Sequence, residues 1–231
     1  MPEKMPEKAP EKVYVYAFCR AADALPPLPE GIAQPLQWVE AADLVAITEP
    51  SLDLNALQQD EARLVSAVVH HDWVLCELSR SVTLLPLRFG TQFETVAQVR
   101  SHLQRQADAY QAKLSALQDR AEYCLKFSPQ PITLASPAAE LQGRAYFLAK
   151  KQRLEQQSAT EAQQQAQLAQ LQAEIARCYP RAQVAADRIY LLVHHDELDQ
   201  LQHRYQQWQR HCSDWLLQLS EALPPYHFVE V

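Results

Sequence analysis

The sequence predicts an α+β protein with two domains, at residues 13–120 and 121–231. Short segments rich in β-branched and aromatic residues alternate with longer stretches whose apolar residues recur every three or four positions. In the second half these segments follow the order β-α-β-β-α-β, which is typical of a ferredoxin-like unit. The chain has 231 residues, of which 48% are hydrophobic, so it is long enough to bury a core in each domain.

The N-terminal domain is expected to begin after a flexible tail. Residues 1–12 repeat Pro-Glu-Lys three times, a composition that gains nothing by burial. Residues 13–18 then have the character of a buried strand, and a proline-rich loop follows. Two further short strands are expected at 36–40 and 44–48. This part of the chain should therefore contribute several strands to one sheet.

Two long helices complete the predicted N-terminal domain. The first is capped by Ser51 or Asp53 and runs to about Ser79, and the second spans residues 92–117 with Thr91 as a suitable cap. A buried strand at 82–87 separates them. The residues expected to face the core are Leu57, Leu64, Val68, His71, Leu75 and Leu78 in the first helix, and Val96, Val99, Leu103, Tyr110, Leu114 and Leu117 in the second.

The C-terminal domain is expected to start with a strand at 122–127. A proline-containing connector leads to a helix from Gly143 to Tyr179, whose middle holds nine glutamines between Gln152 and Gln172. This polar middle is too hydrophilic to lie wholly against a sheet, so the helix is expected to extend beyond it.

Two short strands and a final helix follow. The strands are expected at 182–186 and 188–194, and Asp196 can cap the helix. A last strand is expected from Tyr226 to Val231. The apolar stripe of the final helix consists of Leu198, Leu201, Tyr205, Trp208, Cys212, Trp215 and Leu219.

Composition argues against several classes of function. The net charge is −7 and neither half is basic, so the phosphate attraction that dominates nucleic-acid binding is missing. Only three glycines occur, too few for phosphate-binding loops. No apolar run approaches the length of a membrane span, and the N-terminus lacks the apolar stretch of a signal peptide. We therefore expect a cytoplasmic protein that binds neither nucleic acid nor membrane.

The residues that most often carry chemistry do not form a recognisable reactive centre. Five cysteines are spaced tens of residues apart without a C-x-x-C motif. The histidine pairs at 70–71 and 194–195 diverge on any regular backbone, and Cys76 and His71 lie about 140° apart around one helix. We expect no catalytic residue, no metal and no cofactor. The aromatic side chains of the final helix are expected to be core residues rather than a platform for bases.

The most distinctive stretch is LLPLRFGTQF at residues 84–93. It resembles the "LPLRFGTvF" signature of the gas vesicle GvpF/GvpL family. HDWVL at 71–75, EYCLK at 122–126 and GRAYFLAKK at 143–151 resemble further segments of that family in the same order. The chain end is a departure, because the family usually has "G-P-W-P-P-Y-S-F" where this sequence has EALPPYHF at 221–228.

The resemblance implies a non-enzymatic accessory or minor structural protein of gas vesicle assembly, associated with the gas vesicle. Its implied partners are the apolar main shell protein and other gas vesicle accessory proteins. Sheet-edge pairing or a hydrophobic groove could provide the contact, and we expect sheet-edge pairing or a mixture of the two. The alternative is a small-molecule-binding protein or enzyme on a ferredoxin-like scaffold, because fold alone does not fix function.

Six residues are the predicted contacts with these partners. In the signature, Pro86 interrupts strand pairing and Gly90 allows a positive φ. Arg88 beside Phe89 is either an arginine that satisfies carbonyl or carboxyl groups within the protein or an exposed anchor of an interface. The full set is Pro86, Arg88, Phe89, Gly90, Tyr226 and Phe228.

Overall fold

The computed structural model describes residues 12–22, 25–132 and 143–229, which form two compact units. Described residues up to Glu122 and from Ala222 onwards make up the first unit, and Tyr123–Glu221 make up the second. The domain boundaries predicted from the sequence instead placed these last residues in the second domain. The protein is mixed α+β, with one sheet in each unit. Most of the predicted tail lies outside the described residues.

The sheet of the first unit is built around one central strand. β1 (Val13–Arg20) pairs antiparallel with β3 (Leu44–Pro50) on one side and with β4 (Leu84–Pro86) on the other. β2 (Gln37–Ala41) pairs with β3 at the edge, and the two-residue strand β5 (Gln92–Phe93) also pairs with β1. Every residue of β1 except the last is buried, so both faces of this strand must be covered.

A bulge at Tyr16 divides the side chains of β1 between the two faces. The register with β3 shifts between Val15 and Ala17, so Tyr16 is an extra residue in the strand. As a result Tyr16 and Ala17 both belong to one core cluster. Phe18 stacks on Tyr110 of the helix that covers the other face, with ring centroids 5.1 Å apart.

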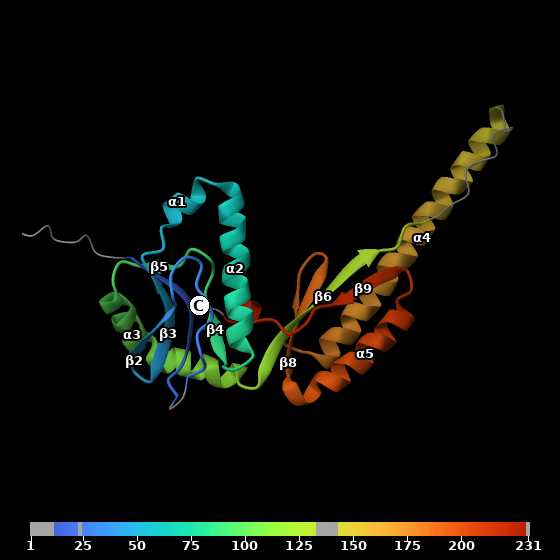
Figure 1. The fold of residues 1–231 in the computed structure, drawn as a ribbon. Helices are drawn as coiled ribbons and strands as arrows, with labels where there is room; N and C mark the ends of the chain where they lie inside the picture. Colours follow the sequence, from blue (N-terminus) through green and yellow to red (C-terminus); the bar gives the residue numbers. More distant parts are fainter. Residues whose placement is uncertain (1–11, 23–24, 133–142, 230–231) are drawn as a thin grey trace, which may run out of the picture. The chain divides into compact units, whose positions relative to one another are not determined.

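Three helices belong to the first unit, and the two long ones cover opposite faces of its sheet (Figure 1). α1 (Leu54–Gln58) and α2 (Glu61–Ser79) replace the single helix predicted here, because Asp60 caps a new start by accepting from the Arg63 N–H group. Of the two predicted caps, Ser51 and Asp53, it is Asp53 that caps α1. Val68, predicted to face the core, is 41% exposed.

α3 (Val96–Leu117) starts later than predicted. Its cap is Thr95, whose hydroxyl accepts from the Gln98 N–H group, and not Thr91. The residues between them were predicted to be helical but include β5, because pairing with β1 satisfies their backbone groups instead. The predicted strand at 82–87 is also shorter, since only Leu84–Pro86 pair.

The second unit has four strands in the sheet order β7-β8-β6-β9, and its helices α4 and α5 cover one face (Figure 1). Burial alternates along β6, where Leu125 and Phe127 are buried and Lys126 is exposed, as expected of a sheet with one covered face. The elements in chain order are β6 (Arg120–Pro129), α4 (Gly143–Cys178), β7 (Gln183–Val184), β8 (Arg188–His194), α5 (Leu198–His211) and β9 (Trp215–Leu219).

The C-terminal region differs most from prediction. α5 ends at His211, and Trp215–Leu219 form a strand instead of two further helical turns. Trp215 and Leu217 are buried whereas Leu216 between them is 50% exposed, which is strand alternation. The predicted final strand is a short 3-10 turn, Tyr226–Phe228, and residues 230–231 lie outside the described part.

A buried polar network joins β1 to α2. The His71 ring nitrogen Nε2 lies 3.1 Å from the Leu87 carbonyl oxygen, which only accepts, so Nε2 carries the proton and donates. Nδ1 then accepts from the Tyr14 hydroxyl at 2.7 Å. Burial lowers the pKa of His71, which agrees with this neutral form. Tyr16 stacks on the imidazole, with centroids 5.0 Å apart.

Glu49 continues the network into the loop before β2. Its fully buried carboxyl group accepts the Tyr16 hydroxyl at 2.5 Å and the backbone N–H groups of Ile32, Ala33 and Gln34 at 2.7–2.9 Å. These bonds fix a loop that no regular secondary structure holds. The buried carboxyl group therefore replaces strand pairing as the anchor of this segment.

Replacing Glu49 with Ala should lower the free energy of unfolding by about 2–4 kcal/mol, because buried donors lose their acceptor. Urea unfolding measures the change. Glu40→Ala, at an exposed position of β2, is the matched control and should shift stability by no more than about 0.5 kcal/mol. Equal midpoints for the two variants would contradict the role given to Glu49.

Acid should destabilise the protein partly through His71. Because its pKa is lowered in the folded state, the unfolded chain binds the proton first as pH falls below about 6.5, and the free energy of unfolding then decreases. One such group contributes a slope of at most about 1.4 kcal/mol per pH unit. His71→Gln should reduce the slope measured by urea unfolding between neutral and mildly acidic pH.

Burial also lowers the pKa of His102, so part of the slope should persist in that variant. His203→Gln, at an exposed position of α5, is the matched control for the removal of one imidazole. The hypothesis fails if His71→Gln and the unmodified protein lose stability equally steeply.

Candidate functional site

The segment from Leu87 to Thr91 is a loop tied at both ends to β1. The Leu87 N–H group donates to the Tyr16 carbonyl at 2.9 Å, and the Val15 N–H group donates to the Thr91 carbonyl at 3.0 Å. His71 holds the Leu87 carbonyl from the α2 side. The distinctive sequence motif is therefore a loop fixed over the central strand; we call residues 87–91 the signature loop.

The tip of the signature loop combines one buried side and one exposed side. Phe89 is partly buried and makes edge contacts with Tyr14 and His71. Gly90 has φ +94°, a conformation that side chains disfavour, and its N–H group donates to the Tyr14 hydroxyl at 3.4 Å. Arg88 is exposed, and its carbonyl accepts the Thr91 hydroxyl at 2.7 Å.

The C-terminal segment is held in the same unit by Glu122. Backbone hydrogen bonds join Glu122 and Leu223 in both directions, at 2.8 and 3.1 Å. The Glu122 carboxyl group, 1% exposed, accepts the His227 backbone N–H at 2.8 Å and lies 2.7 Å from His227 Nδ1. Burial raises the pKa of Glu122. These contacts fix the turn that carries Tyr226.

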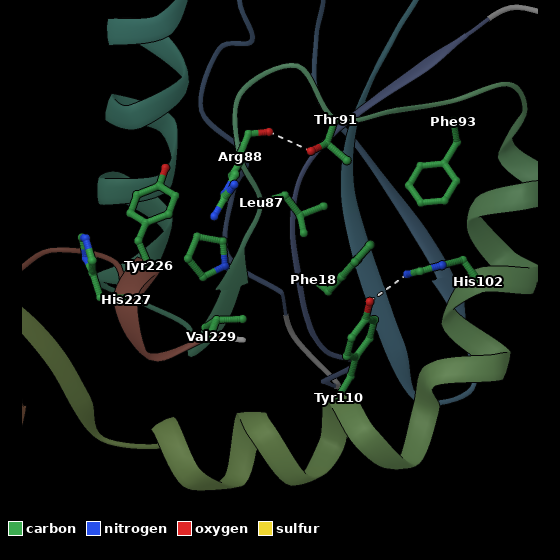
Figure 2. Close-up of a pocket in the computed structure, with 11 residues that line it drawn as sticks. Phe18, Leu87, Arg88, Thr91, Phe93, His102, Tyr110, Tyr226, His227 and Val229 are labelled. Carbon is green, nitrogen blue, oxygen red and sulfur yellow. Dashed lines mark hydrogen bonds between the residues drawn. The ribbon is translucent and has the colours of Figure 1, made fainter. Parts of the chain in front are cut away.

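The signature loop, the C-terminal turn, β1 and α3 together enclose a pocket of about 530 Å³ (Figure 2). In the figure, Tyr226, His227 and Val229 lie on one side, and His102 and Tyr110 lie on the other. The pocket is lined by Phe18, Pro86, Leu87, Arg88, Thr91, Phe93, His102, Tyr110, Tyr226, His227 and Val229.

The wall formed by α3 and β1 is aromatic and neutral. His102 Nε2 and the Tyr110 hydroxyl are hydrogen-bonded at 2.7 Å, and Phe18 packs against both rings. Burial lowers the pKa of His102 and raises that of Tyr110, so both are uncharged near neutral pH. Arg88 brings a positive charge to the opposite wall. The pocket thus suits an apolar group that carries a hydrogen-bond acceptor or negative charge nearby.

Tyr226 closes the pocket beside the signature loop. It packs against the core cluster that includes Tyr14 and Leu75. Burial raises the pKa of its hydroxyl, and a hydrogen bond to Asp72 adds to this effect. Tyr226 is therefore a neutral side chain with one face on the core and another on the pocket.

Three of the six predicted contact residues, Pro86, Arg88 and Tyr226, line this pocket. Phe89 and Gly90 shape the loop beside it, and Phe228 lies in the C-terminal turn. Sequence reasoning did not predict that Phe18, His102 and Tyr110 would join them, because the bulge that turns Phe18 toward α3 has no local sequence signal.

No grouping of reactive side chains stands out in the part of the chain that the structure describes. Burial raises the pKa of Cys19 to about 12 and that of Cys76 to about 11, so both thiols are protonated and weakly nucleophilic at neutral pH. Within residues 12–22, 25–132 and 143–229, no three His, Cys, Asp or Glu side chains are grouped to hold a metal ion. None of the helices described there has the length and apolar character needed to cross a bilayer.

Comparison with solved structures shows the same fold in two proteins. The gas vesicle protein GvpF from Anabaena sp. PCC7120 has a TM-score of 0.66 and 13% identity, with 96% of this chain and 97% of that chain covered. GvpF from Microcystis aeruginosa has a TM-score of 0.67 and 13% identity, with 95% of this chain and 99% of that chain covered.

Sequence comparison finds two relatives in Streptomyces sp. (strain CB03234). Gas vesicle protein L is 32% identical over 152 residues, which cover 58% of this chain and 56% of that protein's length. Gas vesicle protein F is 27% identical over an aligned length of 244, and the match covers 94% of this chain and 99% of that protein. The sequence profile described as "Gas vesicle synthesis protein GvpL/GvpF" matches residues 12–230. The chain therefore belongs to the gas vesicle GvpF/GvpL family.

Proposed function

We propose that this protein is a non-enzymatic accessory or minor structural protein of gas vesicle assembly, which binds the apolar main shell protein and other gas vesicle proteins. The observation that carries the proposal is the pocket between the signature loop and the C-terminal turn, which has one aromatic, neutral wall and an arginine on the other. A shell that excludes water needs very apolar subunits, and such subunits aggregate unless a partner covers them. An apolar side chain of the shell subunit would enter this pocket.

Arg88 gives the pocket its polar contact. Its guanidinium group is exposed at the pocket wall, where it can bond a carbonyl or carboxyl group of the partner. The signature loop and the C-terminal turn border the pocket, and we propose that they also contact the partner through Phe89, Gly90 and Phe228. An arginine beside aromatic side chains is a composition that commonly anchors protein interfaces.

A groove is favoured over sheet-edge pairing at this site. β4 is an outer strand of the first sheet, so a partner strand would have to add along it. Pro86 of that strand has no N–H group to donate. The pocket therefore offers the more complete contact, and sheet-edge pairing at β4 would be secondary.

The second unit fits a ferredoxin-like domain. Its elements follow the order β6-α4-β7-β8-α5-β9, and the sheet order β7-β8-β6-β9 places the first and third strands side by side in the centre. We propose this assignment, with domains near residues 13–120 and 121–231 and the C-terminal turn returned to the first. Cytoplasmic localisation at the gas vesicle is part of the same proposal.

The alternative function, a small-molecule-binding protein or enzyme on a ferredoxin-like scaffold, has one supporting observation. The pocket volume of about 530 Å³ falls within the range of small-ligand sites. However, the pocket belongs to the first unit and not to the sheet of the second. Binding of the shell protein requires no small-molecule ligand, and it can be measured directly by capture of the co-expressed shell protein.

Arg88→Glu should weaken retention of co-expressed shell protein in a native affinity capture by about tenfold, equivalent to about 1.4 kcal/mol. Arg88→Lys keeps the positive charge but loses the planar guanidinium group that can form two hydrogen bonds at once. It should therefore retain less shell protein than the unmodified chain and more than Arg88→Glu. The amount of shell protein per captured chain is the measured quantity.

Arg100→Glu is the matched control, because Arg100 is exposed on α3 and does not line the pocket. It should retain the shell protein like the unmodified chain. Full retention by Arg88→Glu would remove the pocket from the proposal, and an unmodified chain that captures no shell protein would overturn the function itself.

A further inference from the structure

The outward face of α2 is apolar where a helix on a sheet normally presents polar side chains. Val65, Val69 and Trp73 are 57%, 63% and 43% exposed. They recur every four residues on the side opposite Ala67 and His71, which face the core. We call Val65, Val69 and Trp73 the α2 stripe.

The charge beside the α2 stripe is mainly acidic. Glu61 and Asp72 are exposed and lie along one border of the stripe in helical projection. Glu77 and Arg63 lie near the other border, and Glu77 is paired with Arg80. A partner for this face should therefore be apolar with basic flanks.

The first part of α4 has the complementary character. The buried residues of this helix begin at Gln164, so its first five turns do not pack into the sheet. Tyr146, Phe147 and Leu154 are 41%, 70% and 58% exposed and share one arc of the helix. We call these three residues the α4 stripe.

Basic side chains surround the α4 stripe. Lys150 and Lys151 lie on the same arc as Phe147 and Leu154, and Lys151 is also paired with Glu155 at 3.8 Å. Arg144 and Arg153 are close by along the helix. The sequence has no acidic residue between Gly143 and Leu154. This local excess of positive charge stands out in a chain whose net charge is −7.

We propose that the α2 stripe of one copy of this chain binds the α4 stripe of a second copy. The two stripes match in length, since each spans nine residues and about 12 Å of helix. They also match in charge, because the acidic border of α2 would meet the lysines of α4. The inference does not rest on the proposed function, as neither stripe lines the pocket.

The contact joins two different surfaces, so it is heterologous and adds copies in series. Each copy in a pair keeps one stripe free for another copy. Two short helix faces bury less surface than a permanent dimer requires, so the association should be weak and dependent on protein concentration. Added salt should weaken it further by screening the charges that flank the stripes.

Sedimentation velocity of the purified full chain over a wide concentration range tests the proposal. The average mass should rise with concentration at low salt and fall back on addition of salt. Val69→Lys places a like charge against the α4 stripe, and the double variant Phe147→Gln, Leu154→Gln removes its apolar anchors. Each should raise the apparent Kd about tenfold or more.

Mixing the two variants separates this arrangement from one in which like stripes bind each other. Val69→Lys retains an intact α4 stripe, and the double variant retains an intact α2 stripe. The mixture should therefore form pairs containing one of each, and no larger species. Leu216→Lys, at a position of β9 that is 50% exposed, is the matched control and should associate like the unmodified chain.

Two results would overturn the proposal. One is an unmodified chain that remains a monomer at all concentrations tested. The other is a mixture of the two variants that forms no pairs although the unmodified chain associates. Because all substituted side chains are exposed, thermal unfolding should show that each variant is folded.

Discussion

The first unit depends on one constraint, the burial of β1 on both faces. A strand covered on both sides cannot leave polar groups without partners, yet β1 carries two tyrosines. Tyr14 and Tyr16 are two residues apart and both face α2, where His71 and Glu49 accept their hydroxyls, and the bulge at Tyr16 then reverses the alternation along the strand. The same bulge turns Phe18 to the other face, where it becomes a wall of the pocket.

The buried network links this strand to the exposed loops. The neutral imidazole of His71 can donate from only one nitrogen, and the form that donates to the Leu87 carbonyl is also the form that accepts the Tyr14 hydroxyl. Glu49 likewise fixes the loop before β2 through several backbone groups at once. Such networks restrict the loop to one conformation, because alternative arrangements would leave buried groups unsatisfied.

Sequence reasoning predicted the elements with strong periodicity and failed where tertiary pairing decides. The buried residues of α3 and the length of α4 follow from spacing that the helix itself imposes. Trp215 and Leu219 satisfy helical spacing from Cys212, but they also satisfy strand alternation with Leu217, and pairing with β6 selects the strand. The pocket could not be predicted, because it joins residues from both ends of the chain through a bulge and the Glu122 contacts.

The family signature contains both structural and exposed positions, which explains why the sequence left two interpretations of Arg88 open. Leu87 and Thr91 hold the loop through backbone bonds, and Gly90 is required by its positive φ. None of these roles requires an arginine at position 88, whose described hydrogen bonds involve its carbonyl group alone. The described hydrogen bonds leave the exposed guanidinium group of Arg88 on the pocket wall, and this is the group through which the proposed partner would be bound.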